Sequence, residues 1–475
     1  MIALITAKDP AGQPVRMVVH QLIEQGILFD SWESQTPLTA IPEDLSPFDG
    51  MIVDEDILRH ISSAARKKLE KFALQKYVWI IPEHYSTMEA AAAESAIELN
   101  INLFAACAGL KREEFPEIGD RKIIDGFIDR ARDFRQWVLP HICEYHLHFA
   151  EGAMALENTP YAPEDWSSFI DGILADVYTM FAPDGDHDQL CGGSLLELYA
   201  RRRNDPEILN KLFSTVDTLL ENRPRSAEGI VSMGGNRHDP LFFNGIDTPF
   251  FGNNGYTVVG RDLVNNELFH YYGGLFAACA AAGKPHLFAE AMKIMEHIDR
   301  VHRDKDGLFF HASRKSQAFG SKWCRGNTHA LLGAFYMLRR YPGMPDDCRI
   351  KVVKFLKKSL DALQRVQSTS GLWHNILDDP STPLETSSGV LITYIYSWCI
   401  NQGLIAADDA YIAMISRCRK ALKRKFWHGY GSGNCTGTMP AADNPGYYRR
   451  RRMHLYAMPL IAPALIESAK LLNLK

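Results

Sequence analysis

From about residue 120 onward the sequence is a succession of amphipathic helical patterns, and this feature constrains the fold more than any other. About eleven such segments follow one another within roughly 350 residues. They are Ile123–Phe149, Asp165–Met180, Gly193–Arg203, Pro206–Leu220, Leu263–Ala282, His286–Arg303, Thr328–Tyr341, Arg349–Val366, Ser387–Asn401, Ala410–Phe426 and Met453–Leu472. A double ring of paired helices needs about twelve, so the pattern predicts an (α/α)6 barrel.

A weak internal repeat favours the same architecture. Gly229, Gly307 and Gly371 each begin a short apolar stretch that follows a helix and a polar turn, and two of these stretches end in His311 and His374. The spacing is roughly 60 to 80 residues, which suits about one helical hairpin per unit. An open solenoid would give a similar spacing. We favour the closed barrel because aromatic and polar residues concentrate in the loops, where such barrels keep their sites.

The first 118 residues have a different pattern. Short apolar runs at Ile2–Thr6, Gly50–Val53 and Tyr77–Ile81 alternate with amphipathic stretches at Val15–Glu24 and Ile57–Leu74. This alternation predicts a parallel sheet with helices on its faces, as in flavodoxin-like or amidotransferase-like domains. We therefore expect an α/β domain over residues 1–118 and a helical barrel over residues 119–475. The smaller domain is expected to serve assembly of copies of the chain or to cover the site.

The run Ile101–Ala106 is a candidate last strand of the smaller domain, with Cys107 directly after it. A nucleophilic cysteine needs a histidine and an acid nearby, so a buried structural thiol is the better interpretation of Cys107. No Gly-rich phosphate loop follows the first strand, and nucleotide binding is not expected.

Composition excludes several classes of function. The nine cysteines include no Cys-x-x-Cys pair, which argues against a disulfide framework and a structural zinc site. The triplet Asp186–Asp188 has no second ligand cluster to accompany it, so we expect neither a metal nor another cofactor. A formal net charge of -5 argues against a nucleic-acid partner. No apolar stretch is long enough to span a membrane, and Met1–Thr6 begins directly as a strand, so we expect a cytoplasmic protein.

The loops of the helical part contain the side chains of a saccharide pocket. Sugar rings stack on aromatic side chains and offer hydroxyls to paired donors and acceptors, and an arginine binds a uronate carboxylate through two hydrogen bonds. The candidate residues are Tyr271, Tyr272, Trp323, Trp373, Tyr447 and Tyr448 for stacking, and His311, Arg325, Asn327, His329 and His374 for polar contacts. Core packing is the alternative interpretation for any single aromatic residue among them.

Short motifs in the helical part make this interpretation more specific. They are Lys322–Asn327 (Lys-Trp-Cys-Arg-Gly-Asn), Gly371–His374 (Gly-Leu-Trp-His), Leu384–Ser388 (Leu-Glu-Thr-Ser-Ser), Asn401–Gly403 (Asn-Gln-Gly) and Gly433–Thr438 (Gly-Asn-Cys-Thr-Gly-Thr). In this order they resemble segments of the unsaturated uronyl hydrolases of glycoside hydrolase families 88 and 105, over roughly residues 125–475. Asp188 lies where one carboxylate of these families is expected. Glu385 also suits a second role, at the N-terminus of the helix that follows it.

The resemblance implies a six-hairpin glycosidase that takes part in polysaccharide degradation. Such enzymes hydrate the 4,5-double bond of an unsaturated uronic acid at the end of an oligosaccharide. One Asp protonates the alkene carbon and helps to activate water, and a second Asp assists. The first carboxyl group must exchange a proton near neutral pH, and a neighbouring carboxylate raises its pKa to that end.

This sequence departs from the family pattern at the principal Asp, which belongs before a Leu-Phe pair at the start of a long helix. Asn266 stands at that position here, with Glu267 beside it. Either Glu267 or Asp262 takes over the role, or the hydration chemistry is lost. His329 replaces the aromatic residue of the family and is either a second acid/base or a hydrogen-bonding partner of a sugar hydroxyl.

We therefore predict a glycoside hydrolase that acts on uronate-containing oligosaccharides. The predicted catalytic residues are Asp188, Glu267 and His329, and the predicted substrate contacts are Asn266, Tyr271, His311, Trp323, Arg325, Asn327, Trp373 and His374. Three alternatives stay open at this point: hydrolysis of intact glucuronides, a polysaccharide lyase on the same barrel, and a sugar-binding protein without catalysis.

Overall fold

The protein consists of two compact units, each of which has its own core. The computed structural model describes residues 1–7, 13–34, 44–55, 58, 61–82, 90–111, 116–137, 143–182, 190–223, 225–232, 249–252, 255–258, 263–427, 430–435 and 453–474. The first unit comprises Met1–Ile118, Lys423–Thr436 and Arg452–Tyr456, and the second comprises Gly119–Leu422, Gly437–Arg451 and Ala457–Lys475. The sequence-based division at residue 118 did not anticipate the two short C-terminal segments of the first unit.

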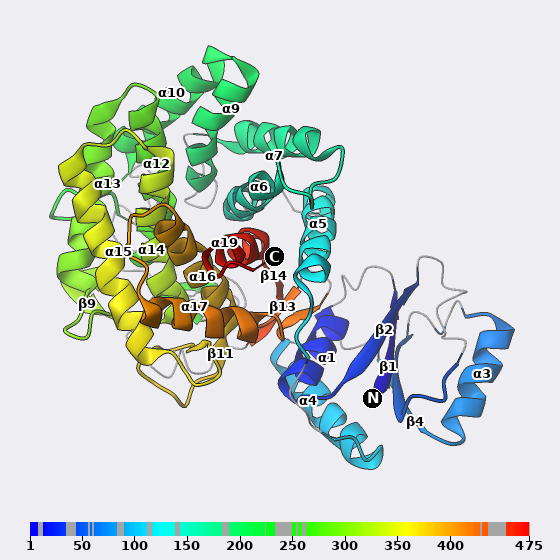
Figure 1. Ribbon diagram of the computed structural model, residues 1–475. Coiled ribbons are helices and arrows are strands. Elements are labelled where there is room, and N and C mark those ends of the chain that lie inside the picture. Colours follow the sequence, from blue (N-terminus) through cyan, green and yellow to red (C-terminus); the bar gives the residue numbers. More distant parts are fainter. Residues whose placement is uncertain are drawn as a thin grey trace. The chain divides into compact units, whose positions relative to one another are not determined.

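A four-stranded parallel sheet forms the centre of the first unit. Its strands are β1 (Ile2–Ala7), β2 (Phe29–Ser34), β3 (Gly50–Asp54) and β4 (Tyr77–Ile81), in the order β2-β1-β3-β4. Helices α1 (Gln13–Glu24) and α4 (Ala90–Cys107) lie on one side of the sheet and α3 (Ser63–Ala73) on the other (Figure 1). This strand order is the beginning of the flavodoxin-like order. The sequence analysis missed β2, the most polar of the strands.

Alternation along the strands explains why both faces are covered. Ala3 and Val53 pack with Leu69 and Phe72 of α3 in one buried cluster. On the other face, a side chain on Gly50 would collide with the ring of Phe104 of α4. A parallel sheet with two apolar faces requires such cover on both sides.

The prediction of a strand at Ile101–Ala106 is wrong, because these residues lie in the last two turns of α4. Ile97, Ile101 and Phe104 are buried at helical spacing, and a short apolar run does not by itself distinguish a strand from such a helical face. Cys107 is exposed, not buried as expected, because it ends the helix on the solvent side.

The C-terminal segments of the first unit form a small three-stranded sheet. Its strands are β12 (Phe426–Trp427), β13 (Tyr430–Cys435) and β14 (Met453–Ala457), of which β12 and β13 are antiparallel. The helix expected from Met453 therefore begins as a strand instead. Ser432 Oγ donates to Glu24 Oε1 at 2.7 Å and lies 2.8 Å from His20 Nδ1 of α1. Lys425 Nζ also donates to Glu24 Oε1, at 2.6 Å. These contacts join the two ends of the sequence within one unit.

The second unit is a closed double ring of helices, and the predicted (α/α)6 barrel is confirmed (Figure 1). Within the described residues, the inner ring contains α6 (Cys143–Leu156), the short helix η2 (Gly192–Leu195) with α9 (Leu196–Arg203), α12 (Asn266–Ala281), α14 (Cys324–Arg340), α16 (Thr386–Asn401) and α19 (Ile461–Leu471). The outer helices are α5 (Asp120–Trp137), α7 (Trp166–Met180), α10 (Pro206–Asn222), α13 (Phe288–His297), α15 (Asp346–Val366) and α17 (Asp409–Leu422). Helix α19 packs against both α16 and α6, which closes the ring and excludes an open solenoid.

Burial separates the two rings. Every residue of α12 from Asn266 to Ala280 is buried, as expected for a helix surrounded by others. Outer helix α15 buries one stripe, which includes Val352, Phe355 and Leu363. The sequence analysis merged α5 and α6 into one helix, Ile123–Phe149, and separating them supplies the twelfth member. Across the described part of the chain, no helix combines the length and the apolar character needed to cross a membrane.

The three glycines of the repeat form the same turn after three outer helices. Gly229, Gly307 and Gly371 have left-handed φ angles of 77°, 87° and 94°, which glycine adopts without strain. The N–H of each glycine donates to the carbonyl three residues earlier, on Ser226, Asp304 and Ser368. A side chain four residues before each glycine donates to the glycine carbonyl, and these side chains are Arg225, Arg303 and Gln367. The same pair of hydrogen bonds therefore stabilises all three turns.

The backbones of α12 and α14 are in close contact where both helices carry glycine. A Cβ atom on Gly333 would lie 2.6 Å from the carbonyl oxygen of Phe269, and one on Gly273 would lie 2.9 Å from the carbonyl oxygen of Gly333. Backbone atoms cannot move aside as a flexible side chain can, so these positions require glycine.

We expect Gly333→Ala to destabilise the barrel by roughly 1–3 kcal/mol, because the added methyl group forces the two helices apart. The measurement is urea unfolding followed by far-ultraviolet circular dichroism. Gly343→Ala is the matched control, since its Cβ would meet only Tyr341, at 3.9 Å, and should change stability by less than about 0.5 kcal/mol. Equal effects of the two substitutions would contradict the close contact of the helices.

Candidate active site

A buried carboxylate at the start of α12 is the centre of the candidate site. Both oxygens of Glu267 contact His311 Nε2, at 2.8 and 3.0 Å, and His329 Nδ1 of α14 lies 3.6 Å from Oε1. Glu267 and His311 have no exposed surface, and His329 is 5% exposed. The structure thus brings together three residues that lie far apart in the sequence and that the sequence analysis had selected.

The surroundings keep Glu267 ionised. Burial alone raises its pKa, but His311 and His329 outweigh this effect and hold the pKa of Glu267 below its ordinary value. Its place in the first turn of a helix also favours a negative charge. Burial lowers the pKa of His329, although Glu267 opposes the shift. The resting site therefore pairs a carboxylate with a neutral His329 imidazole at neutral pH.

Two further histidines, which the sequence analysis missed, extend the cluster. The His270 ring stacks on that of His329 with the ring centres 5.3 Å apart, and His270 Nε2 lies 3.1 Å from His148 Nε2 of α6. Burial lowers the pKa of His148 to about 3 and that of His270 well below its ordinary value. The available signal was the spacing of Glu267 and His270, which places both on one face of α12.

Trp323 and Arg325 form one wall of this cluster. The buried indole of Trp323 lies 4.9 Å from the ring of His311 and 5.9 Å from that of His329. Its Nε1 donates to Asn375 Oδ1 at 3.2 Å. The Arg325 guanidinium lies 5.1 Å from the centre of the indole and is only partly buried. Arg325 is thus the candidate most available to a charged ligand.

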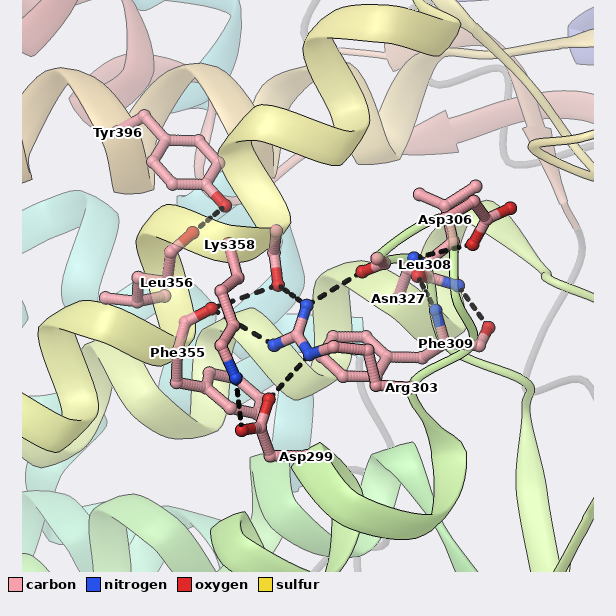
Figure 2. Close-up of polar contacts among 12 residues, drawn as sticks. Asp299, Arg303, Asp306, Leu308, Phe309, Asn327, Phe355, Leu356, Lys358 and Tyr396 are labelled. Atoms are coloured by element: carbon pink, nitrogen blue, oxygen red, sulfur yellow. Dashed lines mark hydrogen bonds and ion pairs between the residues drawn. The ribbon is translucent and has the colours of Figure 1, made fainter.

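Asn327 holds the loop that carries His311. Its Oδ1 accepts from Phe309 N at 2.7 Å, and its Nδ2 donates to the carbonyls of Phe309 at 2.8 Å and Trp323 at 3.0 Å. Figure 2 shows this clamp beside Arg303, which donates to Asp299 and to the carbonyl of Phe355. Both N–H donors of the Asn327 amide are therefore engaged with main chain. This geometry gives Asn327 a supporting role, and its contact with substrate stays a prediction.

The remaining predicted contacts lie in well-defined surroundings. The indole of Trp373 is buried and donates to the carbonyl of Leu363 at 2.8 Å, so its polar edge faces the framework. His374 is partly buried, with Nδ1 2.6 Å from the carbonyl of Thr382. Tyr271 is buried beside His270. Glu385 accepts from Ser388 N at 2.8 Å, which is the N-terminal role that the sequence suggested for it.

Asn266 is fully buried and fixed on both sides of its amide. Its Nδ2 donates to the carbonyl of Phe310 at 3.0 Å, and its Oδ1 lies 2.8 Å from His302 Nδ1. Several other candidates, namely Asp188, Asp262, Tyr447, Tyr448 and the neighbouring Asp186 and His187, lie outside the described residues. Within the described ranges, no group of His, Cys, Asp or Glu side chains is arranged to hold a metal ion.

Comparison with known proteins agrees with this fold. Residues 267–472 match Glycosyl Hydrolase Family 88. The predicted resemblance to families 88 and 105 is confirmed. A possible member of the GH105 family from Salmonella enterica serovar Paratyphi A has 17% identity and a TM-score of 0.59, and the match covers 77% of this chain and 97% of that one.

Two more solved structures have the same barrel fold. The unsaturated glucuronyl hydrolase from Bacillus sp. GL1 has 15% identity and a TM-score of 0.53, with 74% of this chain and 97% of that one covered. A possible GH105 member from Klebsiella pneumoniae has 16% identity and a TM-score of 0.60, with 74% and 93% covered. No curated protein sequence matches the chain. At such identities the likeness establishes the fold.

We expect Asn327→Asp to destabilise the protein by roughly 2–3 kcal/mol, because it replaces the buried donor with an oxygen that faces two carbonyls. Asn210→Asp, on the exposed face of α10, is the control. It also removes a donor, which contacts Glu207 Oε1 at 3.2 Å, but in solvent the change should cost less than about 0.5 kcal/mol. The measurement is the free energy of unfolding in urea. If the two variants unfold alike, the amide clamp does not stabilise the loop.

The lowered pKa of Glu267 also predicts how stability depends on pH. A carboxyl group whose pKa is lower in the folded than in the unfolded state contributes stability above its ordinary pKa, and this contribution is lost as the pH falls through the folded-state pKa. The free energy of unfolding of Glu267→Gln should therefore fall less steeply than that of the wild type as the pH decreases below about 4.5. Glu296→Gln, at an exposed position of α13, should leave the acid limb as in the wild type.

Proposed function

We propose that this protein is a glycoside hydrolase that acts on oligosaccharides ending in an unsaturated uronate. The observation that carries the proposal is the buried cluster of Glu267, His311 and His329, which lies at the N-terminal ends of two inner helices of the barrel. All three residues fall within the segment that matches Glycosyl Hydrolase Family 88. An ionised carboxylate flanked by imidazoles is equipped for proton transfer.

Hydration of the alkene needs a group that accepts a proton from water and a group that delivers one to carbon. Water supplies a proton to one alkene carbon and a hydroxyl group to the other, and the resulting hemiketal opens and releases the next sugar as an alcohol. Glu267 is ionised, so we assign it to accept the proton from water. His329 lies close enough to pass a proton between Glu267 and the substrate.

The second requirement is recognition of the uronate carboxylate. Arg325 is partly accessible and stacks on Trp323 next to His329. Its planar guanidinium suits a bidentate contact with a carboxylate. We assign the carboxylate of the terminal sugar to Arg325. Asp188 stays the candidate second carboxylate on the strength of the sequence, and Tyr271 and His374 stay candidate sugar contacts.

We expect Glu267→Gln to lower kcat by at least about a hundredfold while the affinity for substrate changes little, because the amide cannot exchange the proton. The assay incubates the folded protein with unsaturated uronyl disaccharides and follows the loss of ultraviolet absorbance and the release of sugar. Asp188→Asn should behave in the same way, and Glu296→Gln should match the wild type.

The same assay distinguishes the alternatives. A lyase would increase ultraviolet absorbance on a uronate polymer, and a glucuronidase would release sugar from a saturated disaccharide without a change in absorbance. Equal binding by the wild type and both carboxylate variants, with no turnover by any of them, would favour a sugar-binding protein. Lack of activity on unsaturated substrates from folded protein would refute the proposed reaction.

Two further assignments complete the proposal. We place the enzyme in the cytoplasm, and we assign to the first unit a role in association between copies of the chain. Sequence pattern alone supports both. Cell fractionation tests the first assignment, and light scattering on chains with and without surface substitutions in the first unit tests the second.

A further inference from the structure

A continuous chain of polar groups leads from a partly exposed carboxylate to Asn266, the neighbour of Glu267. Glu228 Oε2 lies 2.8 Å from His297 Nδ1, and His297 Nε2 lies 2.8 Å from Ser313 Oγ. The same hydroxyl lies 2.9 Å from His302 Nε2, and His302 Nδ1 lies 2.8 Å from Asn266 Oδ1. Apart from Glu228, all members of the chain are at most 3% exposed. The proposed reaction gives no role to His297, Ser313 or His302.

The direction of the hydrogen bonds is fixed at the inner end of this chain of polar groups, beside Asn266. The carbonyl of Phe310 can only accept a hydrogen bond, so the amide nitrogen of Asn266 faces it and the amide oxygen faces His302. His302 must then carry a hydrogen on Nδ1 in order to donate to Asn266. Rotating the amide by half a turn would instead place two oxygens opposite each other.

Counting hydrogens shows that neutral rings cannot complete the chain. The four contacts between Glu228 and Asn266 need four hydrogens. A neutral His297 and a neutral His302 supply one each, and Ser313 supplies one, whereas the Glu228 carboxylate and the Asn266 oxygen supply none. With neutral rings, one contact therefore joins two acceptors. One additional proton gives every contact a donor.

We propose that His297 and His302, bridged by Ser313, bind a single shared proton and that this charged chain positions Asn266 and the first turn of α12 beside Glu267. The proton can rest on either ring, because its transfer through the serine hydroxyl leaves all four contacts satisfied. Glu228 is the counter-ion in either case. These residues act through Asn266 and touch no substrate, so they are positioning residues.

The location of the chain explains how it could position the site. Ser313 lies on β8 (Ala312–Arg314), a strand that begins directly after His311. On this strand Ser313 pairs with Val264 of β7 (Leu263–Asn265). The N–H of Asn266 donates to the carbonyl of His311 at 3.1 Å. The chain of polar groups therefore joins β8, the strand that begins directly after His311, to the helix that carries Glu267. His302 belongs to a π-helical turn, Ile298–His302, a kind of irregularity that often accompanies functional sites.

Charged groups face both ends of the chain. Arg300 pairs with Glu228 at the outer end, where the Ser316 hydroxyl also donates to Glu228. At the inner end, burial lowers the pKa of His302. His297 and His311 lower it further, whereas Glu267 opposes the shift. Burial also lowers the pKa of His297, and Glu228 opposes that shift. The pKa of each ring is therefore held below the ordinary histidine value.

The direct test measures the protonation state of the His297 and His302 rings by nitrogen NMR. The full-length protein is labelled at histidine and titrated from about pH 4 to about pH 8. We expect one proton to be taken up by the pair in a single step. In Glu228→Gln the amide supplies the missing hydrogen to His297, so both rings should stay neutral over this range. In Ser313→Ala the bridge is absent, and both rings should again stay neutral.

Ser313→Thr retains the hydroxyl and should restore the shared proton, and Glu296→Gln is a control on α13 that should titrate like the wild type. Loss of the histidine signals in His302→Gln and His297→Gln assigns the resonances. Independent titration of the two rings, or a Glu228→Gln protein that titrates like the wild type, would overturn the proposal. This arm of the test does not require catalytic activity.

The second arm rests on the proposed hydrolase function. The kcat of the wild type should fall at higher pH as the shared proton leaves, and Glu228→Gln should lack this ionisation because its chain stays complete. Ser313→Ala should also lack this ionisation, with a kcat about tenfold below the wild-type maximum and KM changed by less than about twofold, and Ser313→Thr should recover activity. If NMR shows the shared proton but kcat is the same in the wild type and the Ser313 and Glu228 variants, the positioning role is wrong. If neither the wild type nor any variant turns over substrate, only the proposed function fails.

Discussion

The close contact between α12 and α14 is the constraint on which the candidate site depends. Glycine at positions 273 and 333 lets the two backbones approach until a methyl group would touch the opposing carbonyl. This approach sets the separation of Glu267, in the first turn of α12, and His329, in the second turn of α14. Larger residues at the crossing would widen the gap and leave a buried carboxylate without one of its neighbours, a costly arrangement in a protein interior. Packing in the middle of the helices therefore determines chemistry at their ends.

The electrostatics of the site differ from those that the family resemblance implies. The resemblance leads one to expect a carboxyl group whose pKa is raised by a second carboxylate. Within the described residues, Glu267 is surrounded by imidazoles, and its pKa is lowered. The exchangeable protons of the site therefore belong mainly to histidines. Asn266 fits this arrangement, because an amide has the hydrogen-bonding pattern of a protonated carboxyl group and keeps it at every pH.

Features that depend on local periodicity could be predicted from the sequence. The inner and outer helices follow from apolar spacing, and the turn glycines were visible as a weak repeat. The grouping of Glu267, His311, His329, Trp323 and Arg325 followed from residue type and the family resemblance. The prediction of a strand at Ile101–Ala106 was wrong, because apolar residues over two helical turns also fit a buried strand.

The supporting role of Asn327 could not be predicted, since it depends on where the carbonyls of Phe309 and Trp323 point. The pairing of His148 with His270 joins residues more than a hundred positions apart, and no local pattern contains it. A sequence identifies which side chains are able to do chemistry. It does not show which of them are already bound to main chain.

The two C-terminal segments of the first unit have a consequence for the order of events during synthesis. The four strands of the parallel sheet emerge from the ribosome early, within the first 81 residues. Ser432, which contacts His20 and Glu24 of α1, is made only after almost all of the barrel helices. A domain usually folds as a unit while it is being translated, beginning with the N-terminal one. Here part of α1 stays uncovered until the segment that contains Ser432 has been translated. Completion of the N-terminal domain is therefore one of the last steps of folding, and it takes place after the barrel has been translated nearly in full.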